Sequence, residues 1–150
     1  MERGRDQRGR EPVRDDRRGR SSVRDEEPDH RIEMFTGLLP AKDDIALALA
    51  MLASNPLREG TDLEHGHTVT FADSLWEHTE MRSFLLLRPI AEIAPTLRLD
   101  HGLHVEFLQA IPIFASELSF KNEHGAEALM QRWESRQVGF WDPNRGQDPA

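Results

Sequence analysis

The sequence predicts an α+β fold, with a mostly antiparallel sheet flanked by helices and preceded by a disordered charged tail. Polar and apolar residues alternate within residues 67–71, 97–99 and 103–107, which is the period of a strand. Apolar residues repeat at helical spacing within residues 42–54 and 126–133. The turn at residues 100–102 is too short for a parallel crossover, so the strands beside it are expected to be antiparallel.

Residues 1–33 are the expected tail, and residues 34–150 are the expected folded domain. The first 30 residues contain nine arginines and nine acidic residues, but only three apolar side chains and no aromatic residue. Such a segment buries too little apolar area to offset the entropy of ordering it. Its charges cancel, so the net charge of -8 belongs to the folded part.

The first element predicted in the folded part is a helix over residues 42–54. Ile45 and Leu52 lie on one apolar stripe of this alanine-rich segment. The Asn55-Pro56 pair predicts its end, because proline disfavours helical backbone at the residue before it.

Three strand patterns follow. Residues 67–71 alternate, with Val69 and Phe71 on one face. Residues 84–87 are continuously apolar, which is typical of a strand covered on both faces. Residues 97–99 alternate again and lead into the turn.

A longer strand is predicted from Leu103 to its end at Pro112. Val105, Phe107 and Ile111 share one of its faces. The opposite face changes from polar to apolar along the strand. We therefore expect the strand to begin in solvent and to finish buried on both sides.

Two helical segments are predicted after this strand. Ser116 is a suitable N-cap for a helix that starts at Glu117. Gly125 interrupts the helix, and the apolar residues from Ala126 to Trp133 then define a second segment.

Composition excludes several classes of function. The chain has no cysteine, which rules out disulfides and thiolate chemistry. It has no apolar run of the roughly 18–20 residues that a membrane-spanning helix requires, and no secretory signal. Its acidic charge, and the close alternation of arginine with acidic residues in the tail, argue against nucleic-acid binding. We expect a cytoplasmic protein without nucleic-acid or membrane partners.

The residues show no catalytic signature, and we expect no enzymatic activity and no cofactor or metal. The phosphate-binding glycine loop, the serine elbow and the zinc-binding histidine pair are all missing. One alternative stays open, namely a metal-dependent enzyme that uses a histidine cluster. Its nitrogen and oxygen ligands would be His65, His67, His101, His104 and Glu106.

The stretch from Val105 to Met130, VEFLQAIPIFASELSFKNEHGAEALM, resembles the Suppressor of fused domain family. The family pattern has an apolar strand, a proline, a Glu-Leu pair that opens a helix, and a glycine within the helical region. The resemblance extends over residues 38–146. We interpret the motif residues as structural, and they are Phe107, Leu108, Ile111, Pro112, Glu117 and Gly125.

The resemblance implies a non-enzymatic module that binds a protein or peptide, held as a strand added to a sheet edge. Arginine outnumbers lysine 17 to 2, which fits a bacterial member from a GC-rich genome. For bacterial members, the resemblance points to an immunity protein that neutralises a toxin. The N-terminal part of the family domain is expected to be missing here, which leaves open a shortened fragment that does not fold alone.

Overall fold

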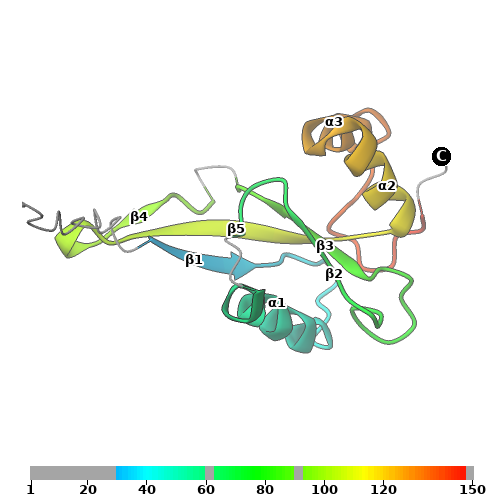
Figure 1. The fold of residues 1–150 in the computed structure, drawn as a ribbon. Coiled ribbons are helices and arrows are strands. Elements are labelled where there is room, and N and C mark those ends of the chain that lie inside the picture. Colours follow the sequence, from blue (N-terminus) through cyan, green and yellow to red (C-terminus); the bar gives the residue numbers. More distant parts are fainter. Residues whose placement is uncertain (1–29, 60–62, 90–92, 148–150) are drawn as a thin grey trace, which may run out of the picture.

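The computed structural model describes residues 30–59, 63–89 and 93–147, arranged around one long central strand, β5 (Figure 1). The elements in chain order are β1 (His30–Phe35), α1 (Ile45–Glu59), β2 (Thr68–Thr70), β3 (Ser83–Leu87), β4 (Leu97–Arg98), a 3-10 turn (Asp100–Gly102), β5 (His104–Ile113), α2 (Ala115–His124) and α3 (Ala126–Ser135). The predicted α+β class is confirmed.

The sheet has the strand order β1-β5-β3-β2, and β4 also pairs with β5. Strand β5 is antiparallel to β3, with Ile111 opposite Leu85, and β4 and β2 also form antiparallel pairs. Strand β1 runs parallel to β5, with Met34 opposite Leu108. The sheet is therefore mostly antiparallel, as predicted.

One face of β5 packs against α1. Leu108 and Ala110 point to this side, because alternate residues of a strand share a face. They belong to a buried cluster, the α1 cluster, with Ile45 and Leu52 of α1 and with Phe84 of β3. Figure 1 shows α1 on this side of the sheet.

The other face of β5 packs against the C-terminal helices. Ile111 and Ile113 form a second buried cluster with Leu129 and Trp133 of α3. The pairing of β5 is continuous from His104 to Ile113, so Phe107 lies on the same face as Ile111. The prediction that this strand ends buried on both faces is confirmed. Its start does not lie in solvent as expected but is half-buried, because β1 and β4 pair with it on either side.

Strand β1 begins at His30, four residues before the expected start of the folded domain at residue 34. Its pattern is the ordinary one of an edge strand, with Arg31 and Glu33 exposed and Ile32 and Met34 packed against the α1 cluster. The expectation for residues 1–29 lies outside the described residues.

Helix α1 continues past the predicted stop at Asn55-Pro56 and ends at Glu59. The expected end at residue 54 was wrong because proline biases the preceding residue away from helix without forbidding it. The helix also starts at Ile45, and Asp43 and Asp44 lie in the turn just before it.

Gly125 separates α2 from α3, as predicted, and has a φ of 92° and a ψ of 166°. Residues that carry a side chain rarely adopt this backbone conformation, which is essentially reserved for glycine. The N-cap of α2 is Phe114, so the expectation of Ser116 at that position was wrong. The side chain of Glu117 accepts the backbone N–H of Phe114 instead, and the amide of Leu118 donates to the carbonyl of Phe114.

Replacing Gly125 by alanine tests the break between the helices. An added Cβ would have no neighbour closer than 3.9 Å, so the cost comes from the backbone conformation alone. We expect Gly125→Ala to lower the free energy of unfolding by about 1–3 kcal/mol in urea denaturation. Gly146→Ala is the control, because no atom lies within 4 Å of its Cβ position and its φ is not in the positive range. Equal stability of the two variants would contradict this account.

Candidate functional site

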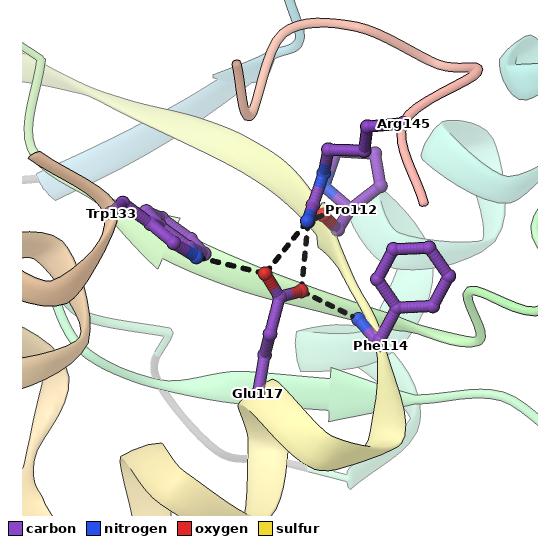
Figure 2. Close-up of polar contacts among 5 residues, drawn as sticks. All are labelled: Pro112, Phe114, Glu117, Trp133 and Arg145. Carbon is purple, nitrogen blue, oxygen red and sulfur yellow. Dashed lines mark hydrogen bonds and ion pairs between the residues drawn. The ribbon is translucent and has the colours of Figure 1, made fainter. Parts of the chain in front are cut away.

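Glu117, near the start of α2, has a buried carboxylate surrounded by hydrogen-bond donors (Figure 2). Its Oε2 accepts the backbone N–H of Phe114 at 2.8 Å, and its Oε1 accepts the indole N–H of Trp133 at 2.8 Å. Both Glu117 oxygens also accept the guanidinium of Arg145, at 2.7 and 2.8 Å. Four donors thus surround one carboxylate, which fills its usual capacity.

The chain positions this carboxylate through the join between β5 and α2. Glu117 is the third residue of α2, where unpaired backbone amides and the helix dipole favour negative charge. The Glu117 side chain turns back to the amide of Phe114, the N-cap residue. This contact is one half of a capping box.

Arg145 links the C-terminal segment to β5. Its Nη2 donates to the carbonyl of Pro112 at 2.9 Å, while its side chain is only 6% exposed. The same guanidinium lies over the ring of Phe114, 5.0 Å from its centroid. A planar guanidinium suits this position because it can bond a carboxylate with two parallel N–H groups and stack on a ring.

Pro112 lies within β5 but lacks an N–H group. Its carbonyl accepts from Arg145 and so points away from β3. In a strand, the nitrogen of a residue points to the same side as its carbonyl. The missing N–H of Pro112 thus removes no hydrogen bond between β5 and β3. Strand β5 continues for one residue beyond the predicted end at this proline.

The polar centre of Glu117, Trp133 and Arg145 is suited to holding structure and not to proton transfer. The carboxylate has no free lone pair for a substrate, and its side chain is 3% exposed. A general base must instead reach the proton that it removes. We interpret Glu117 as a structural residue on these grounds.

The other motif residues occupy packing or backbone positions. Leu108, Ile111 and Pro112 are buried in the sheet, and Phe107 is half-buried on the same face as Ile111. Their structural role stays a prediction, because their positions alone do not measure their contribution.

The structure does not bring the predicted histidine ligands together. Among residues 30–59, 63–89 and 93–147, no group of three or more potential ligands is close enough to hold a metal ion. The backbone N–H of Gly66, between His65 and His67, donates to the carbonyl of Leu86 in β3. Leu86 in turn pairs with Ala110 of β5, so His65 and His67 lie near that part of β5. His104 lies six residues from Ala110 along β5, roughly 20 Å away in an extended strand.

The histidines have local bonds instead. The Nδ1 atom of His67 accepts the backbone N–H of Glu64 at 3.2 Å. The Nδ1 atom of His65 accepts the backbone N–H of Arg88 at 3.0 Å, and its Nε2 lies 3.3 Å from a carboxylate oxygen of Glu127. Glu106, the fifth predicted ligand, forms an ion pair with Arg88. The metal-dependent alternative therefore has no site in the part of the chain that the structure describes.

Glu127 lies in the first turn of α3, and its pKa is lowered from the ordinary value of 4.5. The main cause is the hydrogen bond from its own backbone amide, and the hydrogen bond with His65 adds to it. The carboxyl is exposed, so the effect on stability is modest.

Sequence reasoning missed Arg145 and the indole of Trp133 as partners of Glu117. Residues 117 and 145 are separated by the whole α2–α3 unit, and neither the helical period nor a short motif connects them. The only signal in the sequence was a glutamate at the start of a helix that follows a buried strand. This signal predicted that the helix N-terminus favours the negative charge, but it did not predict a hydrogen-bond partner.

The Glu117–Arg145 pair gives a direct stability prediction. Arg145→Met keeps a long side chain but leaves a buried carboxylate without its cation, so we expect the free energy of unfolding to fall by about 3–5 kcal/mol. Combining it with Glu117→Gln removes the uncompensated charge and should cost less than the sum of the single changes. Urea denaturation of all three variants measures this coupling. Arg98→Met, at an exposed position of β4, is the control, and a similar small effect of Arg145→Met would contradict the prediction.

The lowered pKa of Glu127 predicts a pH dependence. A carboxyl whose pKa is lower in the folded state stabilises the fold above its unfolded pKa, and this contribution is lost as pH falls through the folded pKa. We expect Glu127→Gln to be less stable than the unmodified chain at pH 7, with the difference vanishing below pH 4.5. Glu134→Gln, near the other end of α3, is the control. A difference that persists at acid pH would show that the charge is not the cause.

Residues 16–146 match the family model described as Suppressor of fused protein (SUFU). This match begins well before residue 38, where the resemblance in the sequence starts. No curated protein sequence matches the chain. None of the helices in the described residues has the length and apolar character needed to cross a membrane.

Two solved structures are similar in fold. A SUFU homolog from Neisseria gonorrhoeae FA 1090 has a TM-score of 0.61 and 24% identity, over 80% of this chain and 63% of that one. The Sufu–Fu complex has a TM-score of 0.59 and 16% identity, over 71% of this chain and 46% of that one. The chain thus spans less than two thirds of either matched chain. Because the family model covers most of its residues, the chain belongs to the Suppressor of fused family.

Proposed function

We propose that this protein is a non-enzymatic binding module of the bacterial cytoplasm, and that it acts as an immunity protein that neutralises a protein toxin. Membership of the family supports the binding role, since one member of similar fold was crystallised as the Sufu–Fu complex. The acidic charge of the chain suits a basic protein partner.

The observation that carries the binding role is the open edge of β1. Strand β1 is at the border of the sheet, and in the described residues no strand pairs with its outer side. Alternate backbone N–H and C=O groups of an edge strand point outward and can pair with an added strand. A partner segment bound in this way gains affinity from backbone hydrogen bonds and selectivity from side-chain contacts.

The six residues of β1 favour it over the opposite border of the sheet. Strand β2 has only three residues and offers fewer outward groups. Packing of Ile32 and Met34 against the α1 cluster holds β1 in place. The exposed side chains of Arg31 and Glu33 lie on the other face, where they can contact a partner.

Co-expression with the toxin encoded by a neighbouring gene tests the immunity role. We expect the full chain to restore growth of cells that produce the toxin, and to form a stoichiometric complex with it in size-exclusion chromatography. The host strain with an empty vector is the control. Growth arrest despite abundant full-length protein, with no complex, would contradict the immunity role.

Proline substitution at two adjacent positions tests the edge. In a strand, one of Glu33 and Met34 directs its N–H toward β5 and the other directs it outward. We expect the variant that loses an N–H bonded to β5 to have the lower melting temperature, and the variant that loses an outward N–H to bind the toxin at least about tenfold more weakly. Because Met34 also packs against the α1 cluster, Met34→Pro is compared with Met34→Ala, and Glu33→Pro with Glu33→Ala.

Hydrogen exchange of the unmodified complex provides a second measurement in case both proline variants unfold. Complex formation is expected to slow exchange of the amides of β1 more than those of β2. Unchanged exchange throughout β1 in a stoichiometric complex would refute strand addition and leave the immunity role standing.

A further inference from the structure

A second surface of the molecule combines exposed apolar side chains with acidic ones. It is a groove between α1 and the loop that joins β2 to β3, with a volume of about 520 Å³. Leu47 and Met51 of α1 line one wall, one helical turn apart, and are 71% and 43% exposed. Phe71 and Trp76 from the other side complete its apolar lining.

The apolar wall is unusual because α1 already buries its opposite stripe in the core. Ile45 and Leu52 pack against the sheet, whereas Leu47 and Met51 point away from it. Exposed apolar residues that share a groove are more informative than isolated ones, because they mark surfaces that contact other molecules.

The charged side chains that line this groove are all acidic. Asp44, Asp73 and Glu77 line it, and among the described residues no lysine or arginine does. Glu77 also pairs with His78 at 3.2 Å, and Arg82 donates to the carbonyl of Ala72 at one end without lining the groove. A basic segment thus meets complementary charge here, whereas a second copy of this acidic chain does not.

We propose that this groove binds an amphipathic basic segment of a partner polypeptide, with its apolar side chains between Leu47 and Trp76 and its lysines or arginines at the acidic rim. An apolar face laid into a groove with complementary charges is a common mode of helix recognition. The proposal shares with the proposed function only the assumption that the partner is a polypeptide. It concerns a different surface from the β1 edge, and a synthetic peptide tests it independently of the toxin.

The probe is a helical peptide of leucine and lysine, with the leucines at i, i+3, i+4 and i+7, measured by fluorescence anisotropy against the full chain. We expect Met51→Gln to weaken binding at least about tenfold, the size of effect that truncating a central anchor produces. Met130→Gln is the matched control, because Met130 is 40% exposed on α3, away from the groove. Equal affinity of the two variants would overturn the proposal.

The charge requirement is tested separately. The double change Asp44→Asn and Asp73→Asn should weaken binding severalfold and reduce its dependence on salt, since rim charges act through screened attraction. Glu123→Gln with Glu134→Gln makes the same change in net charge outside the groove. If both pairs weaken binding equally, the peptide is held by overall charge and the groove is not its site.

Oxidation of methionine by peroxide tests whether the groove is open in the protein alone. Mass spectrometry should find Met51 oxidised at about the rate of Met130, as their similar exposure implies. Slow oxidation of Met51 only at high protein concentration would show that a second copy fills the groove. Slow oxidation at every concentration would show that the chain's own residues fill it. Either result would overturn the proposal.

Discussion

The buried pairing of Glu117 with Arg145 is the constraint on which the C-terminal half of the molecule depends. It joins the end of β5, the start of α2, the indole of Trp133 in α3 and the segment after α3. A buried carboxylate is costly unless every oxygen has a donor, so these four parts must be in place together. The helices α2 and α3 pack on only one end of the sheet, and this requirement holds them in a fixed position relative to β5.

The alternation of β5 divides the remaining stability between two apolar clusters. Leu108 and Ala110 pack toward α1, and Ile111 and Ile113 pack toward α3, so one strand supplies both cores. The surfaces proposed for a partner are the outer edge of β1 and the outward side of α1, whose Leu47 and Met51 belong to neither cluster. The proposed contacts of the protein thus follow from where its cores are.

Local patterns predicted the elements whose cause is local. The buried run of β3, the changing face of β5 and the break at Gly125 are each visible within a few residues. The parallel pairing of β1 with β5 is not, because it joins residues 74 positions apart, His30 with His104. The charged sequence before β1 also made its alternation look like part of the tail. The Glu117–Arg145 pair was missed for the same reason of distance. The end of α1 was missed because proline biases the preceding residue away from helix without forbidding it.

Proton exchange of the tryptophan indoles, followed by NMR, tests the central claim that Glu117 is a closed, fully bonded centre. The indole of Trp133 donates to Glu117 in the interior, while Trp141 is 50% exposed and serves as the reference in the same spectrum. We expect the indole N–H of Trp133 to exchange only when the whole chain unfolds, and that of Trp141 to exchange rapidly. If the two indoles exchange at similar rates under native conditions, the Glu117 centre is open to water and does not hold the C-terminal half together.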